Sequence, residues 1–181
     1  MTSIAGAAAG RSFALAAIGK DRPGIVVAVA SVLYEHGCNV EDSTMTLLRG
    51  NFAIMLVFTA PDEATATTIA DALRPACEPM GITFSVLEVD DRARPPEPTH
   101  VVTVYGSDKP GILDRVAHVV AAAGGNITNL SSRLVGEASP VYVLTIEAEL
   151  AEADGLEAEL HTLAADVGVE VSLSPYDAEV L

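Results

Sequence analysis

Asp21-Arg22-Pro23-Gly24-Ile25-Val26 returns 87 residues later as Asp108-Lys109-Pro110-Gly111-Ile112-Leu113. The same spacing relates Gly37 to Gly124, so the similarity extends beyond the hexapeptide and across the segment that follows it. A repeat of this length indicates two copies of one domain, because solenoid repeats are much shorter.

Each copy predicts the order strand, helix, strand, strand, helix, strand. In the first copy Ile25, Val29 and Leu33 recur at helical spacing, and Gly37 follows as a left-handed helix end. The expected strands are 13–18, 40–48, 52–59 and 82–89. The expected helices run from Pro23 or Gly24 to His36 and from Glu63 to Cys77. In the second copy the expected strands are 100–105, 127–135, 141–148 and 169–174, and the expected helices are 112–123 and 156–167.

This order of elements predicts an α+β fold. Each copy should form a ferredoxin-like βαββαβ domain, an antiparallel four-stranded sheet with two helices on one face. The expected organisation is an N-terminal tail at 1–11, a first domain at 12–89, a linker at 90–98, a second domain at 99–176 and a C-terminal tail at 177–181. The linker is charged and proline-rich, which favours an extended, fairly stiff conformation.

Two strands of the first copy are apolar on both faces, 13–18 and 52–58. In a sheet with helices on one side, the other side is normally polar and solvated. We therefore hypothesise that the face without helices is covered by the other copy or by a second chain.

The composition disfavours several classes of function. The 181 residues include 10 Lys and Arg against 25 Asp and Glu, a net charge of −15, which disfavours direct contact with nucleic acid or with an anionic membrane. No apolar run approaches a membrane span and the N-terminus lacks the pattern of a signal peptide, so we expect a cytoplasmic protein. Cys38 and Cys77 are too few for a disulfide framework and should be reduced.

The repeated loop has the chemistry of a carboxylate site, because N–H groups at a helix start carry a partial positive charge. Proline is tolerated in a first helical turn, and glycine lets a ligand approach the backbone. Asp21 and Asp108 would either cap the helix or face a ligand ammonium group. Turn geometry alone explains the same residue types equally well.

Two further pairs of residues could likewise have either a structural role or a role in ligand binding. Asn39 and Asn126 fit a left-handed turn position as well as they fit a ligand contact. Arg22 and Lys109 keep a cation at the same place in both copies, either as a solvated surface charge or as a partner for a carboxylate.

These loops, together with the Gly-x-Asn segments at Gly37-Cys38-Asn39 and Gly124-Gly125-Asn126, resemble the ACT domain family. That resemblance implies a regulatory module that commonly binds amino acids between two domains. It implies these ligand-binding residues: Asp21, Arg22, Pro23, Gly24, Ile25, Val26 and Asn39 in the first copy, and Asp108, Lys109, Pro110, Gly111, Ile112, Leu113 and Asn126 in the second. Two such domains in tandem resemble the glycine cleavage system transcriptional repressor family, which implies action through a protein partner.

No motif for catalysis or metal binding is found. The four histidines lack metal-ligand spacing, and Gly124-Gly125 is a helix end, not a dinucleotide fingerprint. We expect no catalytic residue, metal or cofactor, and a homo-oligomer that senses a small metabolite, with glycine cleavage or amino-acid metabolism as the regulated process. The alternative functions are a separate regulatory subunit of an amino-acid biosynthetic enzyme and an oligomerisation module without a ligand.

Overall fold

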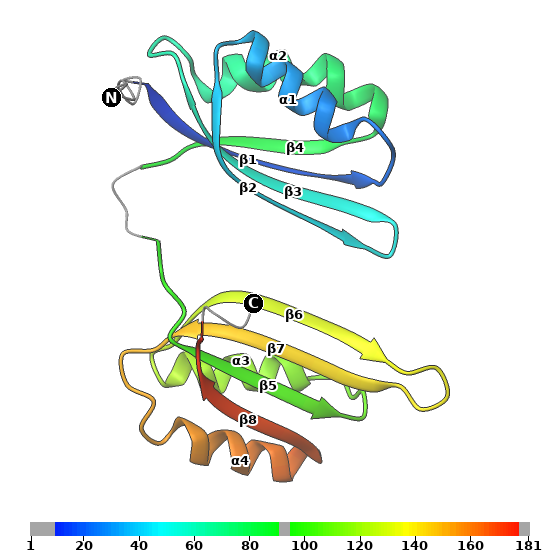
Figure 1. Ribbon diagram of the computed structural model, residues 1–181, viewed down its shortest axis with the longest axis vertical. Coiled ribbons are helices and arrows are strands. Elements are labelled where there is room, and N and C mark those ends of the chain that lie inside the picture. The colour runs from blue at the N-terminus through cyan, green and yellow to red at the C-terminus, as the bar shows by residue number, and fades with distance from the viewer. Residues whose placement is uncertain (1–9, 91–94, 178–181) are drawn as a thin grey trace, which may run out of the picture. The chain divides into compact units, whose positions relative to one another are not determined.

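The computed structural model describes residues 10–90 and 95–177 (Figure 1). It divides into two compact units, Met1–Ala93 and Arg94–Leu181. Most of the expected N-terminal tail, residues 91–94 of the expected linker and residues 178–181 of the expected C-terminal tail lie outside the described residues.

Both units show the predicted order of elements. The first contains β1 (Arg11–Lys20), α1 (Ile25–Glu35), β2 (Asn39–Leu48), β3 (Asn51–Ala60), α2 (Ala66–Cys77), the short 3-10 helix η1 (Glu78–Met80) and β4 (Thr83–Glu88). The second contains β5 (His100–Gly106), α3 (Ile112–Ala122), β6 (Asn126–Val135), β7 (Val141–Glu149), α4 (Leu156–Val167) and β8 (Val169–Pro175). The sheets are ordered β2-β3-β1-β4 and β6-β7-β5-β8, with every pair antiparallel.

In each unit the two helices cover the same face of the sheet (Figure 1). The ferredoxin-like α+β fold expected from the sequence is therefore confirmed in both copies. Each unit also has its own core, because the buried residues form two separate clusters.

Alternation along the strands builds these cores. In β3 the side chains of Phe52, Ile54, Leu56 and Phe58 are buried toward the helices, while the residues between them point to the opposite face. Helix α1 adds Ile25, Val29 and Leu33 at the predicted helical spacing.

Helix α2 starts later than predicted. Its first residue is Ala66, not Glu63, because Thr65 caps the helix. The Thr65 hydroxyl accepts from the Thr68 backbone N–H at 3.1 Å, and the Thr68 hydroxyl accepts from the Thr65 N–H at 2.9 Å. Pro75 lies inside the helix, which continues to Cys77 before η1 follows.

Local backbone features set the strand register. Arg49 and Gly50 both have positive φ, 49° and 76°, so β2 and β3 are joined by a tight two-residue turn. The β2–β3 register shifts between Val40 and Asp42, and the β6–β7 register shifts between Ile127 and Asn129. The irregularity thus recurs at the same place in both copies, just after the Gly-x-Asn segment.

Candidate functional site

The two Asp-x-Pro-Gly loops connect β1 to α1 and β5 to α3. Gly24 (φ 94°) and Gly111 (φ 89°) are the N-caps of these helices, in the left-handed region that favours glycine, and neither helix has a side-chain cap. Ala28 N–H donates to Gly24 O at 2.9 Å. The N–H groups of the preceding first-turn residues have no acceptor within the helix and can bind an anion.

This geometry corrects two expectations. Asp21 and Asp108 do not cap the helices, because the glycine occupies the N-cap and no side chain bonds to the first turn. Pro23 and Pro110 precede the N-cap and are not part of the first helical turn.

The loop residues differ in their access to solvent. In the first loop Asp21, Arg22, Pro23 and Gly24 are exposed, and Val26 is about half exposed. Ile25 is buried and anchors the helix in the core, so its side chain does not face a ligand. A methyl group added at Gly24 would meet no atom within 4 Å, so the space above the loop is open.

The second loop repeats this arrangement. Asp108, Lys109, Pro110, Gly111 and Leu113 are exposed. Ile112 is buried in the core of its unit and takes the place that Ile25 has in the first.

Asn39 is the first residue of β2 and pairs with Thr59, so the left-handed alternative is wrong for it. Thr59 also pairs with Ser12, near the start of β1, whereas the loop follows Lys20 at the other end of that strand. Eight residues of β1, or about 27 Å, therefore separate the end of the sheet at Asn39 from the end at the loop. One small ligand therefore cannot touch both the loop and Asn39 of the same copy.

Asn126 holds the same place in the second unit. It begins β6, opposite Glu149, and it is not left-handed. The residues expected to bind ligand thus lie at opposite ends of each sheet.

The cations of the two loops have different partners. Lys109 Nζ donates to the carbonyl oxygen of Val167 at 2.5 Å, in the last turn of α4. Lys109 is thus an exposed cation that contacts the C-terminal end of a helix, where cations are favoured. Within the described residues no hydrogen bond or ion pair involves the side chain of Arg22.

The helix starts also differ in charge. Asp114 lies in the first turn of α3, and the first turn of α1 contains no acidic residue. The equivalent residue in α1 is Val27, which is exposed. A carboxylate near the start of α3 offsets the partial positive charge there, so the first loop is the more favourable one for an anion.

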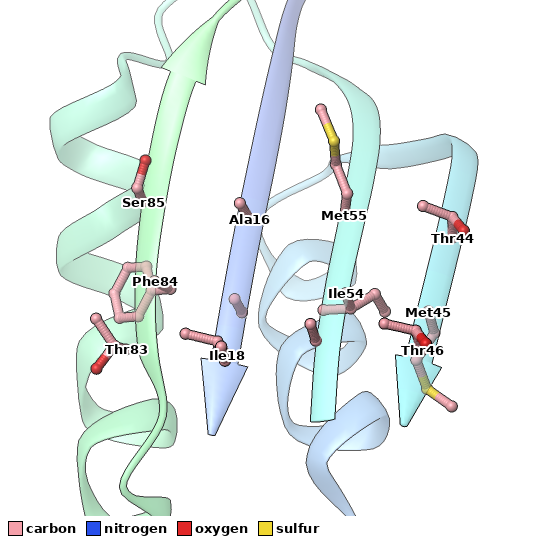
Figure 2. Close-up of a pocket in the computed structure, with 12 residues that line it drawn as sticks. Ala16, Ile18, Thr44, Met45, Thr46, Ile54, Met55, Thr83, Phe84 and Ser85 are labelled. Atoms are coloured by element: carbon pink, nitrogen blue, oxygen red, sulfur yellow. The ribbon is translucent and has the colours of Figure 1, made fainter. Parts of the chain in front are cut away.

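A second feature is the face of the first sheet that the helices do not cover. It contains a hollow of about 490 Å³ (Figure 2). Ser85, Ala16, Met55 and Thr44 form one row across the four strands, as their pairing shows. Sequence periodicity indicated apolar residues on both faces of β1 and β3, but it did not identify the Thr and Ser side chains that β2 and β4 add.

Other kinds of site are not found in the described ranges. No group of His, Cys, Asp and Glu in residues 10–90 and 95–177 is arranged to hold a metal ion. Among the same residues, none of the helices combines the length and apolar character that a membrane span needs. Burial raises the pKa of the Cys38 and Cys77 thiols, which favours the unreactive protonated form.

Comparison with known proteins matches both units to one family. Residues 12–87 and residues 100–165 each match an ACT domain model. The UPF0237 protein MK1213 of Methanopyrus kandleri is 40% identical over 74 residues, which cover 40% of this chain and 82% of that protein.

Two longer matches include both units. The glycine cleavage system transcriptional repressor of Escherichia coli is 31% identical over 120 residues, 66% of this chain and 63% of the repressor. This chain thus matches less than two thirds of the repressor's length. A crystal structure of an unknown protein from Galdieria sulphuraria shares the fold with a TM-score of 0.80 and 24% identity, over 92% of this chain and 99% of that one. The chain belongs to the ACT domain family and carries two ACT domains in tandem.

Proposed function

We propose that this protein is a non-enzymatic, cytoplasmic regulator that senses a small metabolite, an amino acid, and passes that state to a protein partner. The observation that carries the proposal is the pair of ACT domains, which accounts for most of the chain. Its similarity to a glycine cleavage system transcriptional repressor supports a role in regulation. The net charge of −15 favours a protein partner over direct contact with DNA.

The first loop is the better candidate for the sensing site. Its N–H groups at the start of α1 would bind the ligand carboxylate, with Arg22 as a second, charge-assisted donor. The exposed carboxylate of Asp21 would face the ligand ammonium group. Asn39 would contribute only if a second ACT domain brings it to the loop, because within one unit it lies at the far end of the sheet.

The second loop has the same backbone but a different electrostatic setting. Lys109 is bonded to α4, and Asp114 repels an anion at the helix start. We expect this loop to bind an amino acid more weakly, with Asp108, Pro110 and Gly111 serving the turn and Leu113 belonging to the first turn of α3.

The test is thermal unfolding of the full chain against a panel of amino acids, with glycine and serine included. A ligand at 100 times its dissociation constant adds about 2.7 kcal/mol to the stability of the unit that binds it. For a unit of this size the midpoint rises by roughly 10–20 °C.

Matched glycine variants assign the effect to one loop. Gly24→Ala and Gly111→Ala each place a methyl group in open space, so both should stay folded at a cost of about 1 kcal/mol from the left-handed backbone. We expect Gly24→Ala and Arg22→Ala to abolish the ligand-dependent rise, and Gly111→Ala to retain it.

Other outcomes would change the proposal. Loss of the rise in Gly111→Ala alone would assign sensing to the second loop. A chain that no amino acid stabilises would contradict the sensing role and favour a regulatory subunit or a structural module. A search for co-purifying catalytic subunits would distinguish these two alternatives.

A further inference from the structure

The outer side of helix α1 is apolar, although it is exposed to water. From Ile25 to Tyr34 the helix contains no charged residue. Val27 and Tyr34 are 67% and 82% exposed, and Ala30 lies between them at helical spacing, so the three form one stripe. A helix that is hydrophobic on all sides is normally buried, which indicates that another molecule covers this one.

Strand β2 extends the apolar surface beside the helix. Met45 and Leu47 pair with Ile54 and Phe52, whose side chains are buried toward the helices. Met45 and Leu47 therefore point to the helix side, yet each is about half exposed, because β2 is an edge strand that α1 covers only in part. We call the following residues the α1 surface: Val26, Val27, Ala30, Tyr34, Met45 and Leu47.

The other helices do not have such a surface. In α3, Asp114 takes the place of Val27. His118 takes the place of Ser31 in the same helix. Helices α2 and α4 also expose charged residues on their outer sides. The apolar surface is therefore a property of α1 and not of the fold.

One end of the α1 surface is basic. Arg22 lies in the loop from which α1 starts, and Arg49 lies in the β2–β3 turn. The Asp21 N–H donates to Gly50 O at 3.0 Å, which holds that turn against the loop. Neither arginine has a hydrogen bond or an ion pair within the described residues.

The other end of the α1 surface is acidic. Glu35 is the last residue of α1, and Glu41 lies near the start of β2. Glu63 lines a hollow together with His36, which follows the helix. These three carboxylates likewise have no partner in the part of the chain that the structure describes. The dipole of α1 has the same polarity, positive at its start and negative at its end.

We propose that the α1 surface is the docking site for an amphipathic helix of the regulatory partner. That helix has an apolar stripe, acidic residues at the end that lies over the loop, and basic residues at its other end. The proposal rests on the proposed function in that it takes a protein partner to exist. A partner helix bound here lies along the element whose first turn would contact the ligand, so both would act on α1.

Spacing and charge both fit a helix. Val27, Ala30 and Tyr34 follow the i, i+3, i+7 pattern by which helices recognise one another, and the small Ala30 in the middle lets a second helix approach closely. Complementary charges at the two ends would fix the direction in which the partner helix lies.

The size of the surface favours a partner helix over a second copy of the chain. The eleven residues of α1 are about 16 Å long, and the helix with the adjacent strand is about 15 Å wide. Two such faces bury on the order of 500 Å² in total, about half of the roughly 1,000 Å² that a stable, specific interface requires. The surface therefore suits a weak and reversible contact.

The experiment is fluorescence anisotropy with the full chain and a labelled synthetic helical peptide. This peptide has leucines at helical spacing, glutamates in its first half and lysines in its second half. Two control peptides keep the leucines but carry only glutamates or only lysines. We expect the peptide with separated charges to bind several-fold more tightly than either control.

Variants of the chain locate the binding site. Tyr34→Asp and Val27→Asp should each raise the dissociation constant at least about tenfold, because the new carboxylate loses water without gaining a partner. Both positions are largely exposed, so the variants should keep the fold, which circular dichroism checks. Ala121→Asp is the matched control at the position of Tyr34 in α3, and it should leave the dissociation constant unchanged.

A further variant tests the direction of the partner helix. Arg49→Asp removes a cation at the basic end and should shift the preference toward the peptide that carries only lysines. Residue 49 has a φ of 49°, in the left-handed region that Asp tolerates, so the turn should be kept.

Four outcomes would overturn the proposal. The first is a wild-type chain that binds the peptide no more tightly than Tyr34→Asp does. The second is an equal loss of binding in Ala121→Asp. The third is equal binding of all three peptides, which would remove the role of charge. The fourth is a dimer in sedimentation that Tyr34→Asp dissociates, which would show that a second copy covers the surface.

The sensing proposal has a separate readout. Tyr34→Asp should keep the rise in unfolding midpoint that an amino acid produces, because Tyr34 lies at the end of α1 that is far from the loop. A wild-type chain that shows no such rise but binds the peptide would contradict sensing and leave the docking site in place.

Discussion

Phe58→Ala should unfold the first ACT domain at a temperature at which the second remains folded. Phe58 is fully buried, and its ring is stacked on that of Phe13, with the ring centroids 5.9 Å apart. Removing a fully buried phenylalanine side chain costs about 3–5 kcal/mol, because apolar contacts are lost and a cavity remains. A small domain has only about 5–15 kcal/mol of stability in total.

The effect should be confined to one unit, because the core that contains Phe58 includes no residue of the second unit. For a unit of this size a loss of about 4 kcal/mol lowers the unfolding midpoint by roughly 15–30 °C. The milder Phe58→Leu, which keeps most of the volume, should cost about 1 kcal/mol.

Differential scanning calorimetry measures the midpoints, and amide hydrogen exchange read by mass spectrometry assigns each transition to a unit. Exchange should accelerate in β1 and β3 and remain slow in β5 and β7. Leu144→Ala is the matched variant in the second core, since Leu144 is also fully buried, and it should produce the reverse pattern. Equal acceleration in both units would refute the idea of two independent cores. A midpoint that falls by less than about 5 °C would refute the free-energy cost expected for the cavity at Phe58.

Three smaller perturbations test local features. Thr65→Ala removes the capping hydroxyl of α2 and should cost about 1 kcal/mol in urea unfolding, with an unchanged m-value; no loss would mean that the cap is not formed. Gly125→Ala would place its methyl group 2.7 Å from a side-chain carbon of Leu150 and should cost about 1–3 kcal/mol of stability. Cys38→Ala, at the equivalent position of the first unit, should cost less, because Cys38 already has a Cβ. Equal losses of stability in the two variants would contradict the reasoning. Burial raises the pKa of the Cys77 thiol in the folded chain, so the unfolded chain loses this proton first. The free energy of unfolding should therefore decline as pH rises above the usual thiol pKa of about 8.5. A Cys77→Ala variant whose stability declines as steeply as that of the wild type would assign the loss to other groups.

Much of the fold follows from local pattern. Helical spacing in α1 and alternation in β3 predicted these elements to within one or two residues. The start of α2 was misplaced because Glu63 is a good helix former, and the capping interaction between Thr65 and Thr68 that excludes it was not identified.

The candidate site was predicted less completely. Residue types at the Asp-x-Pro-Gly loop identified a turn before a helix, and the left-handed glycines at 24 and 111 fit that prediction. The same residue types did not distinguish the two loops. That difference comes from Lys109 reaching Val167, a residue 58 positions later in the chain, and no local pattern reports a contact of that kind.

The duplication and the class of fold were thus readable from the linear order of residues, because each depends on short-range periodicity and on a repeated motif. The regulatory role was implied only by the resemblance of that motif to the ACT domain family. Three-dimensional packing decided where these residues meet. Antiparallel pairing of β1 with β3 and of β2 with β3 places the loop and Asn39 at opposite ends of the sheet, although only 18 residues separate Asp21 from Asn39. The same pairing brings Thr44, Met55, Ala16 and Ser85 into one row on an open face, because strand register joins residues that are distant in sequence.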